Sequence, residues 1–385
     1  MGRLVLISAA EVSGDVLGAA LARELLTLDP ALTLAGLGGP RMAASGVEVL
    51  ADITHTSIVG FFDGTRHLPS YLRANRAVRR ALAGRSPAAV VAIDAPGFNF
   101  PLLDAARRRG IPTIYYVCPQ TWWWNPDGAA ARLRRAAAHA VAVVPDEAAL
   151  YRAHGLPTIH HGHPIVDLVE CAPRDPQDRP GERGDGPIPI GLLPGSRRHE
   201  TARLLPLMCD AMRLAAAALG PIDIRVGVPS EPWPDSADAA RRLAGRGIRV
   251  TMAHAHEVLR QSRVTLAASG IVLLEACLLD APVVMTYRID RASYWIAHHV
   301  LRLHEKLPHL ALPNLLARER VVPERVQRDA TAGGLAEEIC RLARDGDARR
   351  RMREGYRRVR AALGQKGVTR AIARDMLDIV AASSG

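Results

Sequence analysis

The sequence predicts an α/β protein built from two doubly wound domains. Short runs of Val, Ile, Leu and Ala alternate with segments of helical periodicity, which is typical of parallel sheets covered on both faces. The alternation stops at residues 168–187, which are rich in Pro, Gly, Asp and Arg, and then resumes. At 385 residues the chain is also longer than one ordinary core. We therefore expect Rossmann-like domains at 1–167 and 188–345, a linker at 168–187, and terminal helices at 346–385 that pack back on the first domain or on a second copy of the chain.

The composition is that of a globular protein with a marked positive charge. Hydrophobic residues make up 48% of the chain and charged residues 23%, and the formal net charge is +11, nearly all of it from arginine. The charge favours nucleotide phosphates, nucleic acid or an anionic membrane surface as partners, although a biased, alanine-rich composition explains it equally well. Five scattered cysteines without CxxC spacing indicate buried thiols and no metal site. We expect no signal peptide and no bilayer-spanning segment.

The first domain is expected to alternate strands with helices. Residues 3–9 form a continuous apolar strand, and residues 15–28 show the spacing of a helix that packs on it. Further strands are expected at 32–39, 88–96, 112–119, 140–145 and 158–164, and a helix at 102–110 that is closed by Gly110.

A polar loop follows the first strand. It contains Glu11, Ser13, Gly14 and Asp15. Gly14 permits close packing of helix on sheet, and Asp15 at the helix start either caps the helix or binds a ligand. The loop lacks the GxGxxG spacing, which disfavours a dinucleotide site.

Asp94 directly follows the apolar strand "AVVAI". Ligands of doubly wound sheets bind at the carboxyl ends of the strands, and partial burial there would raise the pKa of a carboxyl toward the range of a general base. An aspartate two residues before Pro96 can instead bond its own backbone in a turn. Both interpretations stay open at this point.

Two aromatic and histidine-rich stretches follow. Trp122, Trp123 and Trp124 cannot all face one side, so one or two are expected in the core and the remainder at the face of a sugar or an acyl chain. The three histidines of residues 160–164 alternate between faces and have no carboxylate cluster nearby. We expect a structural turn there rather than a metal site.

The second domain repeats the alternation. Strands are expected at 188–195, 222–229, 248–253, 263–269 and 282–288, and helices at 201–220, 272–280, 346–363 and 369–382.

The loop of "LLPGSRRHE" (192–200) is typical of an anion site. Gly195 and Ser196 permit a tight turn that exposes backbone N–H groups, and a helix is expected to begin near His199. Arg197 can hold phosphate oxygens in a bidentate contact. The spacing differs from that of a P-loop, so ATPase chemistry is not supported. A simple helix cap at Ser196 is the alternative.

Two more segments of this domain carry candidate residues. Ser269 and Gly270 form a turn after a strand, and Glu275 lies one helical turn further, where it either accepts both ribose hydroxyls of a nucleotide or is a solvated helix residue. The aromatic and basic residues 291–303 suit either interfacial membrane contact or core packing. Asn314 in the following loop can bond a polar group of a ligand.

These motifs, in this order, resemble the lipid-A-disaccharide synthase family. The resemblance covers nearly the whole chain and rests on "SAAEVSGDVLGA", "IDAPGFN", "YYVCPQTWWW", "GHPIVD", "LLPGSRRHE", "ASGIVLLEACLLDAPVV" and "LPNLLARERVVPERVQ". It implies two Rossmann-like domains of the GT-B type facing a central cleft. It also implies an inverting glycosyltransferase, without cofactor or metal, that joins UDP-2,3-diacylglucosamine to 2,3-diacylglucosamine 1-phosphate and yields a β-1,6 disaccharide and UDP. Such an enzyme acts in the cytoplasm at the inner face of the cytoplasmic membrane, on anionic lipid and not on nucleic acid.

The resemblance also implies roles for individual residues. Asp94 matches the essential aspartate and is expected to act as base on the acceptor 6-hydroxyl, and Arg197 matches the arginine that stabilises the leaving diphosphate. The expected substrate-binding residues are Glu11, Ser13, Gly14, Gln120, Gly195, Ser196, Ser269, Gly270, Glu275 and Asn314.

Five positions depart from the family pattern: Ala10, Asp63, Asn125, Asp146 and Ile271. Ile271 stands where a threonine hydroxyl could meet a phosphate. Two alternatives therefore stay open. One is a divergent nucleotide-sugar enzyme, either another lipid glycosyltransferase or an epimerase, and the other is a non-catalytic protein that binds nucleotide or lipid.

Overall fold

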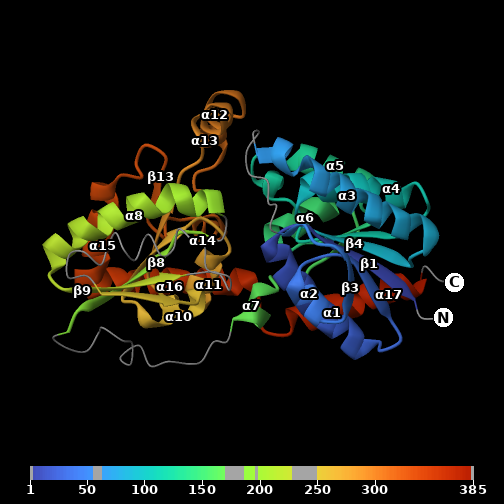
Figure 1. The fold of residues 1–385 in the computed structure, drawn as a ribbon, viewed down its shortest axis with the longest axis horizontal. Coiled ribbons are helices and arrows are strands. Elements are labelled where there is room, and N and C mark those ends of the chain that lie inside the picture. Colours follow the sequence, from blue (N-terminus) through green and yellow to red (C-terminus); the bar gives the residue numbers. More distant parts are fainter. Residues whose placement is uncertain (1–2, 55–62, 170–185, 196–197, 228–248, 383–385) are drawn as a thin grey trace. The chain divides into compact units, whose positions relative to one another are not determined.

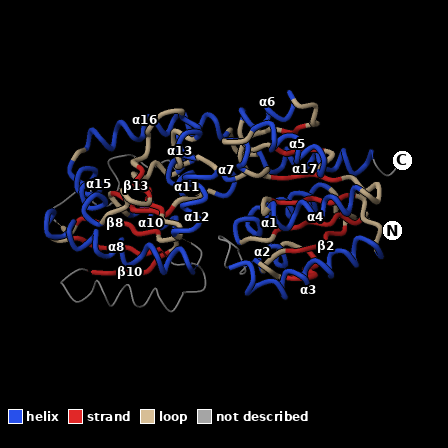
Figure 2. Tube along the Cα trace, turned by 90° about the horizontal axis from the view of Figure 1, so that it is seen from above, coloured by secondary structure: helices blue, strands red, loops and turns tan. Residues whose placement is uncertain are grey.

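The computed structural model describes residues 3–54, 63–169, 186–195, 198–227 and 249–382. The chain divides into two compact units (Figure 1). Unit 1 comprises Met1–Leu168 and Ala362–Gly385, and unit 2 comprises Val169–Ala361. Figure 2 shows that the strands of each unit gather in a sheet flanked by helices. The predicted α/β fold class is confirmed.

The described part of unit 1 contains a parallel sheet of seven strands in the order β3-β2-β1-β4-β5-β6-β7. The strands are β1 (Leu4–Ala9), β2 (Thr33–Leu37), β3 (Val47–Ala51), β4 (Ala89–Ile93), β5 (Thr113–Tyr116), β6 (His139–Val141) and β7 (Thr158–Ile159). β1 and β4 are fully buried, as expected for near-continuous apolar strands covered on both faces. The strand order reverses between β1 and β4, which makes this pair the switch point of the sheet.

Helices cover both faces of this sheet. They are α1 (Val12–Leu28), α2 (Pro40–Ala44), α3 (Asp63–Gly84), α4 (Pro96–Arg107), α5 (Pro126–Ala136), α6 (Pro145–Ala153), α7 (Ile165–Leu168) and α17 (Val368–Ala382), with a short 3-10 helix η2 at Gln120–Trp123. Apolar residues of α3, α4 and α5 share one hydrophobic core with the sheet. α1 packs against α17 on the opposite face (Figure 1).

The described part of unit 2 contains a parallel sheet of six strands in the order β10-β9-β8-β11-β12-β13. The strands are β8 (Ile188–Leu193), β9 (Ile222–Gly227), β10 (Arg249–Ala253), β11 (Val264–Ala268), β12 (Val283–Tyr287) and β13 (Glu324–Val326). The order reverses between β8 and β11, so the switch point of this sheet lies at the loops that follow those two strands.

The helices of unit 2 include two long ones that pack together, α8 and α15. The set comprises α8 (Arg198–Leu219), α10 (Ala255–Gln261), α11 (Val272–Leu278), α12 (Arg291–Trp295), α13 (Leu303–Lys306), α14 (Leu312–Ala317), α15 (Ala332–Arg344) and α16 (Gly346–Leu363), with a π-helix η4 at Ile296–Val300. In the described residues, no helix is both long and apolar enough to cross a bilayer.

The last two helices belong to different units, so the boundary expected at residue 346 does not match the structure. α16 packs within unit 2, where the buried Tyr356 donates its hydroxyl proton to the carbonyl of Ala281 at 3.0 Å. α17 packs on α1 in unit 1, and the carboxylate of Asp167 accepts hydrogen bonds from the amides of Gly367 (2.6 Å) and Thr369 (2.7 Å). The apolar stripes of both helices are therefore covered within the chain. Residues 170–185 of the expected linker lie outside the described residues.

The histidine-rich stretch at residues 160–164 is a structural turn, as predicted. His163 is buried, its Nδ1 accepts the amide of Ile165 at 3.1 Å, and burial lowers the pKa of its imidazole to about 4. His161 contacts the carboxylate of Asp375 on α17 at 2.8 Å, and His160 donates to the carbonyl of Ala142 at 3.0 Å. Each ring thus has its own partner. Among the described cysteines, Cys118, Cys209 and Cys277 are buried and Cys340 is half-buried.

Candidate active site

The turn that follows β4 has a strained backbone. Asp94 and Ala95 both adopt left-handed conformations, with φ of 46° and 43°. For residues with a Cβ, this conformation costs about 1–2 kcal/mol each. The carbonyl of Asp94 accepts hydrogen bonds from Nδ2 of Asn99 and from the hydroxyl of Tyr115, both at 2.7 Å. The turn is therefore held by the surrounding structure, and it places the half-buried side chain of Asp94 at the switch point of unit 1.

Asn99 on α4 ties this turn to the neighbouring strand. Its side chain is completely buried. Nδ2 donates to the carbonyl of Ile93 at 3.0 Å as well as to that of Asp94, and Oδ1 accepts the hydroxyl of Ser8 on β1 at 2.6 Å. One amide thus links β1, β4 and α4. The sequence analysis missed Asn99, although a lone polar residue within the apolar stretch "FNFPLL" signals a buried partner.

The surroundings of Asp94 are acidic and partly desolvated. Burial, followed by the charge of Asp94, raises the pKa of Tyr115 well above its usual value. Burial also raises the pKa of Glu147 on α6 to about 8. Hydrogen bonds from the amides of Val143 and Val144 oppose that shift, and the charge of Asp94 adds to it. The charge of Asp94 thus raises the pKa of two buried groups, Tyr115 and Glu147, because charges interact strongly in a low-dielectric environment.

The residues after β1 differ in burial and in their partners. Glu11 and Ser13 are half-buried at the start of α1. A Cβ on Gly14 would lie 3.3 Å from the Cβ of Ala9, so this glycine permits the close approach of helix and strand, as predicted. Asp15 is buried and accepts the amides of Gly39 (2.7 Å), Met42 (3.0 Å) and Arg41 (3.1 Å). Asp15 is consequently a cap, although of α2 rather than of its own helix.

The tryptophan run lies beside β5. Gln120 is exposed at the start of η2. Trp122 is buried and stacks on Trp123, with ring centroids 4.0 Å apart. Trp123 and Trp124 are half-buried. One tryptophan belongs to the core, as expected, and the other two are partly accessible.

In unit 2, a turn that contains a glycine follows each of the two switch-point strands, β8 and β11. Gly195 after β8 has a φ of 109°, and a Cβ at this position would lie 2.8 Å from Oε2 of Glu200. Gly270 after β11 has a φ of 154° and is exposed. Ser269 beside it is half-buried. α8 begins at Arg198, one residue before the predicted start. Ser196 and Arg197 lie outside the described residues.

Glu275 on α11 has a specific partner. Its carboxylate lies 3.2 Å from Nε2 of His256 on α10, and its side chain is only 18% exposed. The side chain is therefore mostly shielded from solvent and contacts His256. The sequence analysis did not single out His256, because only the tertiary structure brings α10 beside α11.

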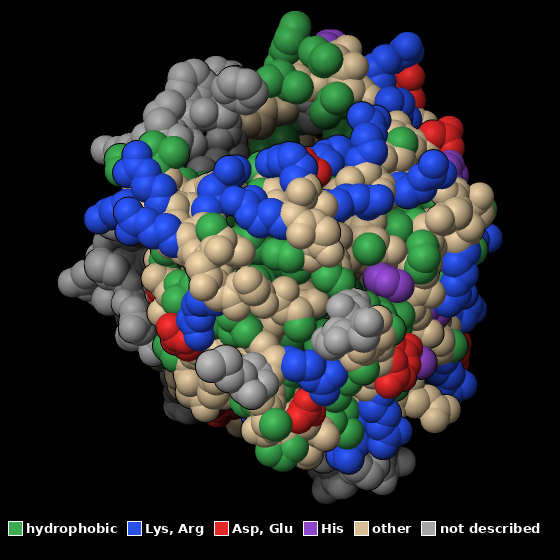
Figure 3. Space-filling view, turned by 90° about the vertical axis from the view of Figure 1, so that its right-hand side faces the viewer, with side chains coloured by type: hydrophobic (Ala, Val, Ile, Leu, Met, Phe, Trp, Pro, Cys, Tyr) green, Lys and Arg blue, Asp and Glu red, His purple; other side chains and the backbone are tan. Residues whose placement is uncertain are grey.

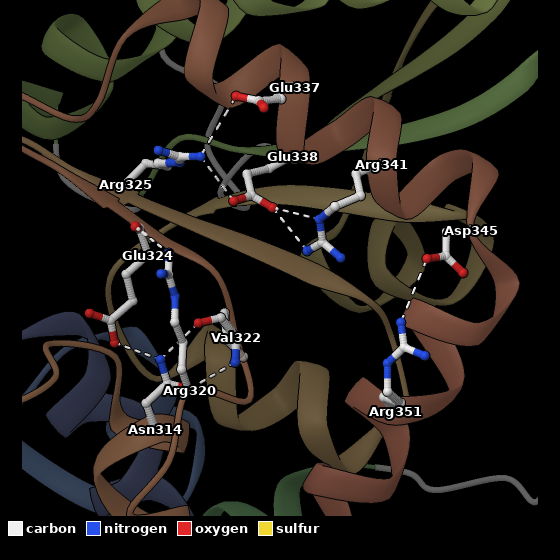
Figure 4. Close-up of polar contacts among 10 residues, drawn as sticks. All are labelled: Asn314, Arg320, Val322, Glu324, Arg325, Glu337, Glu338, Arg341, Asp345 and Arg351. Atoms are coloured by element: carbon white, nitrogen blue, oxygen red, sulfur yellow. Dashed lines mark hydrogen bonds and ion pairs between the residues drawn. The ribbon is translucent and has the colours of Figure 1, made fainter.

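Asn314 was expected to bond a ligand, but its side-chain amide bonds other residues of the protein. Its side chain is fully buried, and Nδ2 donates to the carbonyl of Val322 (2.8 Å) and to Oε1 of Glu324 (2.7 Å). Its Oδ1 accepts the amide of Val322 at 2.7 Å. Figure 4 shows the amide pointing toward these two residues. Both amide protons are used within the protein, so Asn314 positions the start of β13 instead of offering its N–H groups to a ligand.

Comparison with known proteins gives a consistent assignment. A family model described as lipid-A-disaccharide synthetase matches residues 5–375. A lipid-A-disaccharide synthase from Thiobacillus denitrificans is 38% identical over 347 residues, which cover 89% of this chain and 90% of that protein. A second one, from Trichlorobacter lovleyi, is 34% identical over 379 residues, with 98% and 97% covered.

Solved structures of more distant proteins share the fold. The calicheamicin glycosyltransferase CalG4 matches with a TM-score of 0.56 and 16% identity, covering 99% of this chain and 98% of that one. The UDP-GlcNAc 2-epimerase from Neisseria meningitidis, bound to UDP-GlcNAc, matches with a TM-score of 0.62 and 11% identity, covering 98% and 100%. At these identities the likeness shows a GT-B type fold alone, whereas the family match and the curated relatives show that the chain belongs to the lipid-A-disaccharide synthase family of glycosyltransferases.

Proposed function

We propose that this chain transfers a 2,3-diacylglucosamine residue from UDP to the 6-hydroxyl of 2,3-diacylglucosamine 1-phosphate. The products are a β-1,6-linked disaccharide and UDP. Family membership supports this reaction. The observation that carries the residue assignment is the strained Asp94–Ala95 turn at the switch point of unit 1, because such turns persist only where surrounding contacts maintain them.

Asp94 acts in this proposal as the general base. Its carboxylate takes the proton of the acceptor 6-hydroxyl while that oxygen attacks the anomeric carbon of the donor. The bond between the anomeric carbon and the diphosphate oxygen breaks, and its electron pair leaves with UDP. Attack from the opposite face inverts the configuration, so an α-linked donor gives a β-linked product. The bonds from Asn99 and Tyr115 to the Asp94 carbonyl hold the backbone of this turn and are proposed thereby to orient the carboxylate.

The UDP moiety is assigned to the switch point of unit 2. The amino end of the 22-residue α8 and the turns at Gly195 and Gly270 supply backbone N–H groups and a favourable dipole for phosphate. Arg197 is proposed to stabilise the leaving diphosphate. Glu275, with one oxygen against His256, is proposed to accept the ribose hydroxyls. The Neisseria epimerase, which has the same fold, binds a UDP-sugar, and this supports the assignment.

The substrates are lipids, so we also propose that the protein works at an anionic membrane surface. Exposed arginines gather on three helices of unit 1: Arg73, Arg76, Arg79 and Arg80 on α3, Arg107 on α4, and Arg134 and Arg135 on α5, with Arg108 and Arg109 directly after α4. Figure 3 shows a band of basic side chains across this end of the unit. Of the described carboxylates on these helices, Asp104 pairs with Arg132 at 2.8 Å and Asp127 with His154 at 3.1 Å. This face therefore has an excess of positive charge.

One assay tests the proposed reaction. Purified protein is incubated with UDP-2,3-diacylglucosamine and the monosaccharide 1-phosphate in detergent, and mass spectrometry follows UDP and the disaccharide. Wild type is expected to form both products, and Asp94→Asn to be slower by about 10²–10⁴-fold. A wild type that forms no disaccharide would overturn the proposal. Reactions without acceptor test for epimerisation of the donor, the competing chemistry of this fold. Equal unfolding midpoints of both proteins confirm that the variant is folded.

A further inference from the structure

Residues 291–306 of unit 2, which comprise α12, η4 and α13, are called the helical projection below. Figure 1 shows α12 and α13 standing away from the β8–β13 sheet. Large apolar side chains are exposed along it: Trp295 (58%), Val300 (60%) and Leu301 (42%), followed by Leu310 (43%). Of the two interpretations of residues 291–303, core packing is excluded for these side chains. Large apolar side chains that are exposed so close together along the chain are typical of an interaction surface.

The internal contacts of the helical projection explain how it keeps its shape without a core. Tyr294 stacks on His298 with ring centroids 5.4 Å apart, and His298 stacks on His304 at 4.0 Å. Trp295 lies against His299 at 5.5 Å. The π-helix at Ile296–Val300 widens one turn, a feature that occurs frequently at functional sites.

The charge around these apolar groups is positive. Arg302 and Lys306 are exposed, and Glu305, whose carboxylate lies 2.6 Å from Arg302, is the one acidic residue in the sequence of residues 291–306, so basic residues outnumber it there. Desolvation, together with the charges of His304, His299 and Arg328, lowers the pKa of His298.

We infer that the helical projection inserts into an anionic lipid surface, with Trp295, Val300 and Leu301 at the boundary between headgroups and acyl chains and Arg302 and Lys306 on lipid phosphates. Amphipathic elements enter this boundary by only about 5–10 Å, which suits a narrow projection. Tryptophan is enriched there, and long basic side chains reach from the apolar region back to the headgroups. A stable protein partner needs about 1,000 Å² or more of matched surface, which three exposed apolar side chains on a short projection do not provide.

This inference deepens the proposed function, since it rests on lipid substrates and names the part of unit 2 that meets the bilayer. It is tested with the full chain and vesicles of phosphatidylcholine, with or without phosphatidylglycerol. The double variant Trp295→Ser, Leu301→Ser is expected to lower the partition coefficient on phosphatidylglycerol vesicles about tenfold or more. Leu214→Ser on α8, which removes an apolar side chain that is 49% exposed, is the matched control and should bind as wild type does. Wild-type partitioning of the double variant would overturn the inference.

A second measurement guards against a folding artefact. Trp295→Phe keeps the apolar contact and should bind vesicles, but it should lose most of the fluorescence quenching that brominated lipids cause in wild type. Quenching that is equal in Trp295→Phe and wild type would place Trp295 outside the bilayer and refute the inference.

Turnover in detergent separates this inference from the proposed function. The double variant should transfer sugar at the wild-type rate between detergent-dispersed substrates. If wild type itself shows no transfer while its vesicle binding depends on Trp295, the proposed function fails and the inference stands.

Discussion

Replacement of Asn99 by alanine is expected to lower both the stability of the protein and its catalytic rate. The completely buried side chain makes three hydrogen bonds of 2.6–3.0 Å, to Ser8, Ile93 and Asp94, and a longer one of 3.4 Å to the carbonyl of Ser8. At about 1 kcal/mol net for each bond, the free energy of unfolding should fall by about 3 kcal/mol. The Asp94–Ala95 turn also loses a support of its left-handed backbone, so its carboxylate should rotate away from the acceptor hydroxyl.

A base displaced by about 1 Å costs about a hundredfold in rate, so kcat of Asn99→Ala should fall about hundredfold while KM for the UDP-sugar changes little. Disaccharide formation as a function of donor concentration measures both constants, and urea unfolding measures the stability. Ser8→Ala removes only the 2.6 Å bond to Oδ1 of Asn99 and should cost about 1 kcal/mol with a smaller effect on kcat.

The pH–rate profile separates a positioning role from a purely structural one. Its acid limb reports the base in the enzyme–substrate complex, and it should move in Asn99→Ala if the surroundings of Asp94 change. A variant that loses stability but keeps both the wild-type kcat and the wild-type acid limb would show that the turn does not orient Asp94, and the reasoning would be refuted.

Two further predictions concern single side chains. Glu275→Gln should raise KM for the UDP-sugar about tenfold, because hydrogen bonds from ribose hydroxyls to a charged acceptor are worth about 1.5–3 kcal/mol; an unchanged KM in donor titrations would remove Glu275 from the nucleotide site. His163 has a folded-state pKa of about 4, below its ordinary value, so the unfolded chain binds the proton first as the pH falls. Wild type should therefore lose up to about 3 kcal/mol of stability between about pH 6.5 and 4 relative to His163→Gln, as measured by urea unfolding at each pH.

The strands at both switch points were predictable because their signal is local. The runs before Asp94 and Gly195 are short, apolar and followed by turn residues, so periodicity alone locates their carboxyl ends. Other elements were missed. β3 contains Glu48 and lies at the edge of its sheet, so its alternation is weak. α3 contains Pro69 within a strongly charged sequence, which hides the helical spacing of its buried residues Ala74, Val78, Ala81 and Leu82.

The residues that support the site were less accessible to sequence analysis. Ser8 and Asn99 are 91 residues apart, and no local pattern records their contact. His256 and Glu275 likewise meet only because α10 and α11 pack together. For Asn314 the motif was identified but the direction of its amide was not, since that depends on Val322 and Glu324 at the start of β13.

The sequence by itself determined the α/β class, the two parallel sheets, the glycine turns and the family, because these depend on periodicity and on short motifs along the chain. The tertiary structure alone decided which partners the buried polar groups have within the protein. Asp15 and Asp94 both follow buried strands, yet three backbone amides of α2 and its preceding loop occupy the first. The second lies on a strained turn, where Asn99 and Tyr115 bond its backbone carbonyl. The physical reason is that a buried polar group takes whichever partner the fold brings within about 3 Å, and that partner is often remote in sequence.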